Sequence, residues 1–189
     1  MRKRILMAAA EEMKTRGVKF TMSDLARRLS LSKTSLYEHF TSKNQLVHDI
    51  LTTAIQDIQE QEQEIYSNPA LSVAEKIQAL LKISPKVFGA INNHSLYDNL
   101  CHYYPDEWQL VSEFRQKQLN HLTSFIISNI ENNLLRPINV VVLRQIVTSA
   151  MNDLFNFRFL EESNMTHADA LAAMADIVGY GLLPRNIPK

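Results

Sequence analysis

The segment TMSDLARRLSLSKTSLYEHFTSK, residues 21–43, constrains the fold of this chain more than any other. Thr21 can cap a short helix, because Asp24 follows three residues later as in a capping box. Ser30-Leu31-Ser32 then breaks the helical periodicity, and Ser32 is suited to cap a second helix. The pattern therefore predicts two short helices joined by a tight turn.

The second of these helices has an apolar face and a polar face. Leu36 and Phe40 are spaced i and i+4, so both can be buried, and Ala26 of the first helix is small where the two helices cross. The polar face carries side chains that can reach phosphate oxygens or base edges: Lys33, Thr34, Ser35, Tyr37 and His39. This combination is typical of a helix-turn-helix, whose second helix enters the major groove of DNA. The alternative is a plain helical hairpin whose polar residues are only solvated.

Residues 5–50 resemble the N-terminal domain of the TetR (tetracycline-repressor-like) family of bacterial transcriptional regulators. The matching positions are the run from Ile5 to Ala10, Gly17, Thr21, Leu25-Ala26, Ser32, Leu36-Tyr37, His39-Phe40, Ser42-Lys43 and Leu46. The resemblance implies an all-α fold, with an N-terminal three-helix helix-turn-helix domain and a C-terminal helical ligand-binding and dimerisation domain. We expect the DNA-binding domain to span residues 1–47 and the second domain residues 48–189.

The resemblance also implies roles for individual side chains. Tyr37 and His39 are expected to contact phosphates, and Lys43 to anchor a backbone phosphate. Lys33 is the expected guanine reader, with a phosphate contact as the alternative. Ser30 departs from the family, which has Gly, Asn or Asp there; Ser tolerates a left-handed turn poorly, so we expect a slightly different turn. The expected DNA-binding residues are Thr21, Lys33, Thr34, Ser35, Tyr37, His39 and Lys43.

The formal net charge is zero, but the charges are unevenly distributed. Residues 1–50 hold ten Lys and Arg against five Asp and Glu, and the rest of the chain holds ten against fifteen. The attraction for phosphate is therefore concentrated in the part that carries the helix-turn-helix. Arg2-Lys3-Arg4 forms a short basic arm, which either touches the DNA backbone or only solubilises the N-terminus.

A long helix follows the helix-turn-helix. The sequence Ser42-Lys43-Asn44-Gln45 is a capping box that opens it, and the apolar periodicity continues to about Ser67. We expect this helix to begin at DNA and to end in the second domain, as the mechanical link between them. Its expected solvent face is formed by Gln56, Asp57, Gln59, Glu60, Gln61, Glu62, Gln63 and Glu64.

The middle of the chain contains a cluster of aromatic and imidazole residues. The resemblance implies an effector pocket among the middle helices, and the candidates are Phe88, His94, Tyr97, Cys101, His102, Tyr103 and Trp108. The alternative is ordinary core aromatics with surface histidines. A single Cys rules out an internal disulfide or a CxxC site. Because the two histidines of the cluster have no third ligand at a suitable spacing, we expect no metal site.

The last two expected helices, residues 139–161 and 166–178, are apolar over more than one face and so need cover on more than one side. The resemblance implies that they form a two-fold four-helix interface between protomers. The candidate interface residues are Ile146, Ala150, Leu154, Leu171, Met174 and Val178. The alternative is that these faces form only the core of the monomer.

Together these features predict a sequence-specific DNA-binding transcriptional regulator, a repressor by default. We expect a homodimer on a palindromic operator of double-stranded DNA, released by a small-molecule effector. The alternative is a DNA-tethered interaction protein whose second domain binds a protein partner. We find no catalytic motif, so we expect neither enzymatic activity nor a cofactor. No stretch reaches the length of a membrane span, and we expect a cytoplasmic protein.

Overall fold

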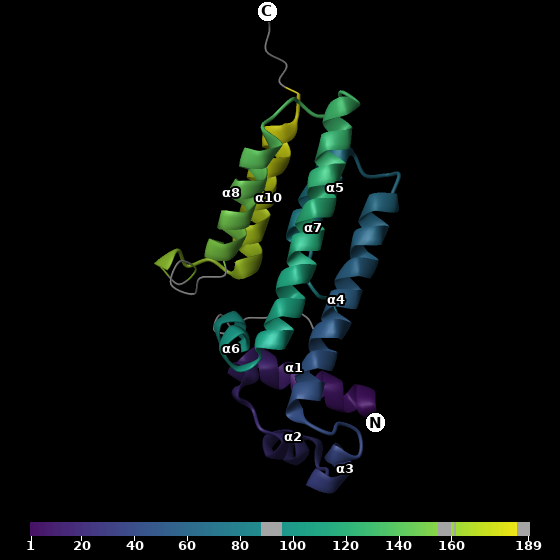
Figure 1. Ribbon diagram of the computed structural model, residues 1–189, viewed down its shortest axis with the longest axis vertical. Coiled ribbons are helices and arrows are strands. Elements are labelled where there is room, and N and C mark those ends of the chain that lie inside the picture. Colours follow the sequence, from purple (N-terminus) through teal and green to yellow (C-terminus); the bar gives the residue numbers. More distant parts are fainter. Residues whose placement is uncertain (88–95, 155–159, 161, 185–189) are drawn as a thin grey trace, which may run out of the picture. The chain divides into compact units, whose positions relative to one another are not determined.

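The computed structural model describes residues 1–87, 96–154, 160 and 162–184 (Figure 1). The described residues contain helices and no strand, which confirms the all-α prediction. The elements are α1 (Arg2–Arg16), the 3₁₀ helix η1 (Gly17–Lys19), α2 (Met22–Leu29), α3 (Lys33–Tyr37), α4 (Lys43–Ser67), α5 (Val73–Lys82), α6 (Leu96–Tyr103), α7 (Pro105–Glu131), α8 (Val140–Leu154) and α10 (His167–Leu182).

The chain packs into two compact units. The first unit comprises residues 1–59 and 84–113, and the second comprises residues 60–83 and 114–189, so that α4 and α7 contribute residues to both. These units are defined by packing. The expected functional boundary between residues 47 and 48 therefore remains a prediction.

The core of the first unit is built by α1, α2, α3 and the start of α4, with residues from α6 and the α6–α7 junction. Its largest fully buried side chains are Phe20, Phe40, Ile5, Leu25, Leu36, Leu46 and Leu100. Burying Leu36 and Phe40 together leaves the rest of α3 free to present polar side chains. At about 25 cal/mol per Å² of apolar surface, such side chains stabilise the domain by roughly 1.5–3 kcal/mol each.

Local signals end and start these helices where the sequence predicts. Gly17 has φ 63° and ends α1, with its N–H donating to the carbonyl of Met13. The capping box of α2 is complete: the amide of Asp24 donates to Thr21 Oγ1 at 3.1 Å, and the amide of Thr21 donates back to the Asp24 carboxylate at 3.1 Å. Ser32 caps α3 by accepting from the amide of Ser35 at 3.0 Å.

The turn between α2 and α3 is left-handed. Ser30 has φ 55° and ψ 40°, and its N–H bonds back to the last turn of α2. The expected change in the shape of this turn is therefore not seen, because Ser30 itself takes the conformation that Gly or Asn usually supplies.

The second unit is held together by α5, α7, α8 and α10. The largest contact is between α5 and α10, and α8 lies beside α10 (Figure 1). Ile77, Leu81, Ile126 and Leu182 are among the buried residues of this core. Arg144 of α8 donates to the side-chain oxygens of two α7 residues, Asn120 at 2.6 Å and Gln116 at 3.2 Å. Polar contacts thus supplement an apolar core.

Candidate nucleic-acid interface

Helix α3 presents the polar face that the sequence predicts. Lys33 and Thr34 are exposed, Tyr37 is 46% exposed, and His39 just beyond the helix is half-buried. Among the described residues, the side chains of Lys33, Thr34 and Tyr37 have no hydrogen-bond or ion-pair partner. Ser35 differs, because its hydroxyl lies 3.0 Å from that of Ser32 in the helix cap. The first three side chains are therefore available to phosphate oxygens and base edges.

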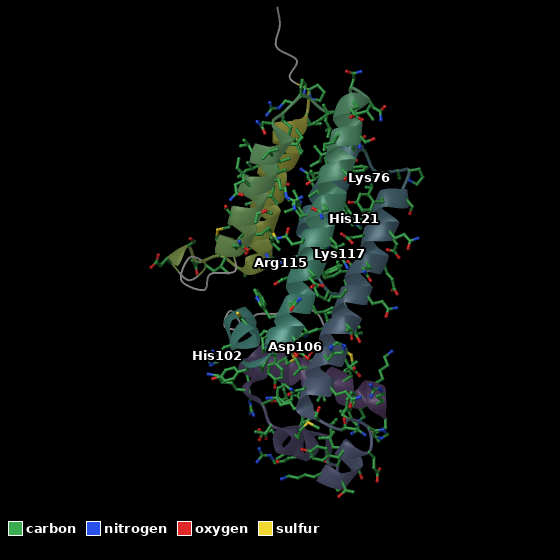
Figure 2. The ribbon with its side chains drawn as sticks, in the orientation of Figure 1. Lys76, His102, Asp106, Arg115, Lys117 and His121 are labelled. Carbon is green, nitrogen blue, oxygen red and sulfur yellow. The ribbon has the colours of Figure 1, made fainter. Side chains whose placement is uncertain are left out.

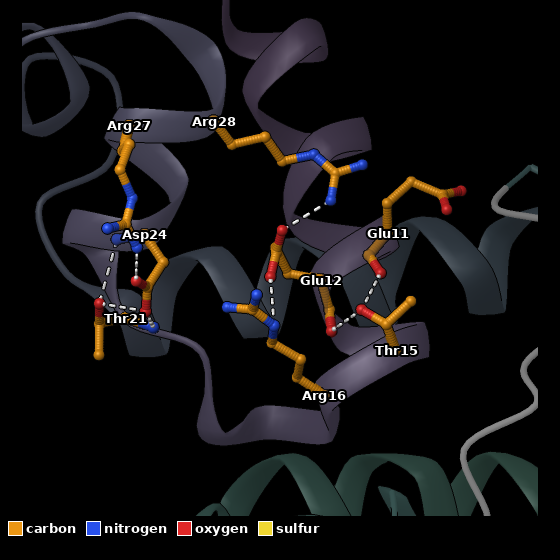
Figure 3. A network of polar contacts seen from close by, with 8 residues as sticks. All are labelled: Glu11, Glu12, Thr15, Arg16, Thr21, Asp24, Arg27 and Arg28. Carbon is orange, nitrogen blue, oxygen red and sulfur yellow. Dashed lines mark hydrogen bonds and ion pairs between the residues drawn. The ribbon is translucent and has the colours of Figure 1, made fainter.

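Thr21 is exposed but already engaged in the cap of α2. Its hydroxyl donates to the Asp24 carboxylate at 2.6 Å and accepts from the amide of the same residue. The hydrogen bond from Thr21 is the main cause that lowers the pKa of Asp24. Arg27 also donates to this carboxylate at 2.6 Å (Figure 3). The capping contacts hold the start of α2, and a phosphate contact of Thr21 remains a prediction.

Lys43 is half-buried and points into the first unit. Its ammonium group donates to the carbonyl of Val18 and lies 4.7 Å from the ring centroid of Phe20 and 5.8 Å from that of Tyr104. Burial lowers the pKa of Lys43. In this conformation the side chain is committed to protein groups, so a phosphate contact requires it to change rotamer. That role remains a prediction.

The basic arm holds the helix-turn-helix together, a role that the sequence analysis did not anticipate. The guanidinium of Arg2 donates to the carbonyl of His39 at 2.9 Å, lies 4.3 Å from the ring centroid of Phe40, and pairs with Asp49. Arg4 donates to the carbonyl of Leu29 at 3.3 Å. Arg2 thus joins the start of α1 to the residues that follow α3 and to α4. Nothing local in the sequence identifies these contacts.

A buried ion-pair network connects α1 to α2 (Figure 3). Glu12 is only 6% exposed, and its carboxylate lies 2.6 Å from Arg28 and 3.5 Å from Arg16. A buried carboxylate is costly unless it is paired, so the network fixes how α2 packs on α1. Because α2 in turn contacts α3, the network supports the position of α3 indirectly.

Residues 5–50 match the family described as "Bacterial regulatory proteins, tetR family". This match identifies residues 5–50 as a helix-turn-helix domain of the tetR-family type. The match, together with the geometry of α2 and α3, makes the protein a DNA-binding transcriptional regulator of the helix-turn-helix class. Within the described residues, no helix is long and apolar enough to cross a membrane.

Similar proteins match this chain over nearly its whole length. The "Uncharacterized HTH-type transcriptional regulator YvaF" of Bacillus subtilis is 27% identical over 182 residues, which cover 96% of this chain and 95% of that protein. A putative regulator from Saccharomonospora viridis in complex with choline has a TM-score of 0.77 at 16% identity, covering 97% of this chain and 98% of that one. AibR in complex with isovaleryl coenzyme A and operator DNA has a TM-score of 0.62 at 18% identity, covering 94% and 97%. The two structures show a shared fold.

The predicted effector residues are only partly described. Phe88 and His94 lie outside the described residues, as does the side chain of Tyr97. Cys101, His102 and Tyr103 are exposed on α6, and Figure 2 shows His102 pointing outward from that helix. Trp108 is half-buried and packs against the core of the first unit. The four described side chains do not form one enclosed group, and their role remains a prediction.

The second unit contains a buried polar group that the sequence analysis did not predict. Glu62 and Gln61 were expected on the solvent face of α4, and this was wrong: they are only 9% and 8% exposed. The side chain of Gln118, from α7, donates to Glu62 Oε1 at 3.1 Å. Burial raises the pKa of Glu62, and the contacts with Gln118 and His121 partly oppose that rise. Helical periodicity cannot reveal this, because the cover comes from a distant helix.

One turn beyond Glu62, the hydroxyl of Tyr66 is buried and has no hydrogen-bond partner. Burial, with the nearby charge of Glu62, raises the pKa of Tyr66 to about 12. The ring of Tyr66 meets that of Phe125 edge-on, with the ring centroids 5.3 Å apart. Tyr66 was not among the residues predicted from the sequence, and its i, i+4 spacing from Glu62 is the one local signal that marks it.

The predicted dimer residues fall on two different faces. Ile146 of α8 is 57% exposed, whereas Leu171 and Val178 of α10 are buried within the protomer. Ala150 and Met174 are half-buried, and the side chain of Leu154 is not described. Several large apolar side chains that were not predicted are exposed on the same two helices: Val141, Val142, Ile177 and Tyr180. We call Val142, Ile146, Ile177 and Tyr180 the apolar stripe.

Proposed function

We propose that this protein is a homodimeric repressor that binds a palindromic operator and leaves it when a small molecule binds its second domain, residues 48–189. The observation that carries the proposal is the exposed, unpaired polar face of α3 on a fully capped helix-turn-helix. In this proposal Lys33 and Thr34, in the first turn of α3, reach base edges, and Tyr37 and His39 bind phosphates.

The position of His39 supports this assignment. Its backbone carbonyl is held by Arg2 and the neighbouring Phe40 is fully buried, so the segment after α3 is fixed on both sides. A rigid segment presents a phosphate ligand without a large loss of conformational entropy on binding. The charge of the first fifty residues adds a general attraction for DNA.

The apolar stripe supports the homodimer. Ile177 is 75% exposed and Tyr180 is 70% exposed, both on α10, and α10 contacts α8, which carries the exposed Ile146. Leaving several large apolar side chains in water is unfavourable, and burying them against a second copy removes that cost. A two-fold dimer presents two recognition helices, which is the arrangement that a palindromic operator requires.

Release by an effector requires a ligand that binds two conformations with different affinity. Two proteins of the same fold are described with small molecules, choline in one case and isovaleryl coenzyme A in the other, and the second also with operator DNA. We propose that the effector of this protein binds in the second domain, residues 48–189, and shifts α4, whose first residues belong to the first unit.

DNA selection from random sequence, followed by binding measurements on variants, tests the DNA-binding part of the proposal. We expect a palindrome. Lys33→Ala should weaken binding by about 1–3 kcal/mol and relax selection at one position in each half-site if Lys33 reads a base. Tyr37→Phe removes one hydroxyl and should weaken binding equally for all sequences. Lys43→Ala should reduce the slope of log affinity against log salt by about one.

Lys117→Ala is the matched control, because it removes the same charge from an exposed position on α7 in the second unit (Figure 2). It should leave sequence selection unchanged. Failure of the folded wild type to select any sequence, or equal losses for the control and the α3 variants, would refute the assignment of α3 to DNA.

A further inference from the structure

In the second unit, a buried carboxylate and a buried phenol hydroxyl lie between two helices. They belong to Glu62 and Tyr66 on α4, which contact Gln118 and Phe125 on α7. Glu62 and Tyr66 are four residues apart, so they lie on the same face of the helix. Gln118 donates to Glu62 at 3.1 Å, and Phe125 contacts the Tyr66 ring. Two helices that are distant in sequence thus enclose a carboxylate, a phenol and an aromatic ring.

The hydrogen-bonding capacity of this group is largely unused. A carboxylate can accept about four hydrogen bonds, and Gln118 is the donor that reaches Glu62 Oε1. The Tyr66 hydroxyl could donate one and accept another, yet it is buried and makes none. The nearby ammonium of Lys76 does not supply it, because it donates instead to the Tyr66 backbone carbonyl at 2.8 Å. Buried polar groups are rarely left unpaired in proteins without a functional or structural reason.

The charge of the group is also only weakly compensated. Of the charged residues in the described chain, His121 is the one that lowers the pKa of Glu62, and it is exposed. The negative charge of Glu62 in turn raises the pKa of Tyr66, after burial itself. A positive charge placed beside the two side chains would favour the ionised carboxylate and offset the cost of burying its charge.

The aromatic rings narrow the class of ligand. An organic cation is attracted by the π faces of Tyr and Phe as well as by a carboxylate. Glu62 would repel an anion, and a neutral ligand would leave the charge of the Glu62 carboxylate uncompensated. A primary ammonium also brings N–H donors, which the oxygens of Glu62 and Tyr66 can accept.

We propose that Glu62 and Tyr66, with the ring of Phe125, bind the ammonium group of a small organic cation. This inference rests on the proposed function, because it names the chemical class of the effector that the second unit would recognise. Glu62 pairs with the charge, the Tyr66 oxygen accepts an N–H, and Phe125 contacts the carbon skeleton beside the charge. A bound ammonium group would displace Gln118 from Glu62. Because this contact joins α7 to α4, binding would be coupled to a movement of α7 against α4 within the second unit.

Calorimetric titration of the full-length protein tests the proposal. The probes are butylammonium, hexylammonium and phenethylammonium, each compared with the neutral alcohol of the same carbon skeleton. We expect at least one ammonium ion to bind and its alcohol to bind on the order of ten-fold more weakly or not at all, the equivalent of about 1.4 kcal/mol or more. Glu62→Gln should abolish that preference, because the amide keeps the shape but not the charge.

Two further variants separate a binding role from a structural one. Tyr66→Phe removes the unpaired hydroxyl, so it should weaken ammonium binding while leaving the unliganded protein as stable as the wild type or more so. Glu64→Gln removes the same charge from an exposed position on α4 and should bind like the wild type. Failure of all three ammonium ions to bind, or equal binding by Glu62→Gln and the wild type, would overturn the proposal.

Operator binding, measured in parallel, distinguishes this inference from the proposed function. Retained operator selection without any ammonium binding would refute the cation site and leave the regulator intact. Ammonium binding without operator selection would support the site and refute the regulatory proposal. If both hold, the bound ammonium should lower operator affinity, and Glu62→Gln should remove that effect.

Discussion

Ser30, in the turn of the helix-turn-helix, has a backbone conformation that is unfavourable for its residue type. Three non-glycine residues of the described chain have positive φ, namely Ser30, Asn133 and Asn164. Asn tolerates the left-handed conformation, because its short side chain can bond locally, whereas Ser does so less well. Ser30 nevertheless ends α2, since the direction of the chain into α3 demands it.

Ser30→Gly should therefore raise the free energy of unfolding by about 1 kcal/mol, because it removes the β-carbon clash of the left-handed conformation. Urea denaturation with unchanged m-values would measure this. Ser30→Ala is the control: it keeps the β-carbon and should give no gain. Equal stability of Ser30→Gly and the wild type would show that the turn carries no strain.

At the level of elements, α10 is positioned by a glycine at its contact with α5. A β-carbon at Gly179 would lie 2.5 Å from the Cγ of Gln78, whereas one at Gly181 would meet nothing within 4 Å. The two helices also share polar contacts, since Lys82 lies 3.3 Å from Asp176 and Gln78 donates to the same carboxylate. The small residue lets the helices approach closely enough for these contacts to form.

Gly179→Ala should lower the free energy of unfolding by roughly 1–3 kcal/mol, because Gln78 must move and the helices must separate slightly. Gly181→Ala is matched in chemistry and lies two residues away in the same helix. It should be neutral or slightly stabilising, since alanine is the better helix former. Thermal unfolding of both variants measures the difference, and identical effects would show that the α5–α10 contact tolerates extra volume.

For the whole molecule, the central question is what covers the apolar stripe. Leu171 and Val178 pack inward, which fixes the opposite side of α10 as the side that carries Ile177 and Tyr180. A second copy of the chain would bury this side, and so would a different protein partner. The oligomeric state in solution distinguishes the homodimer from the DNA-tethered interaction protein.

Analytical ultracentrifugation should find a dimeric wild type and a monomeric or much weaker dimer for Ile177→Glu, because a charge would be buried at the interface. Operator affinity should fall with it, since each monomer holds only one recognition helix. Leu134→Glu, at another exposed apolar residue of the turn after α7, should remain dimeric. A monomeric wild type that still selects a single half-site would favour the protein-partner alternative.

Local sequence signals are enough to predict the helix-turn-helix and its caps. Thr21 with Asp24, and Ser32 with the amide of Ser35, lie three residues apart, so local chemistry decides them. The end of α1 follows in the same way from Gly17, and the start of α4 from the capping sequence at Ser42.

Which side of each long helix is covered depends instead on how the helices pack against one another. Glu62 is buried because α7 packs over it, and Lys43 turns inward because Val18, Phe20 and Tyr104 surround it. Likewise, α10 is apolar on two faces, and periodicity alone does not predict which of them is buried. The face that packs against α5 becomes part of the core. These outcomes depend on contacts between residues far apart in the chain, where the energy of burial, and not local conformational preference, sets the result.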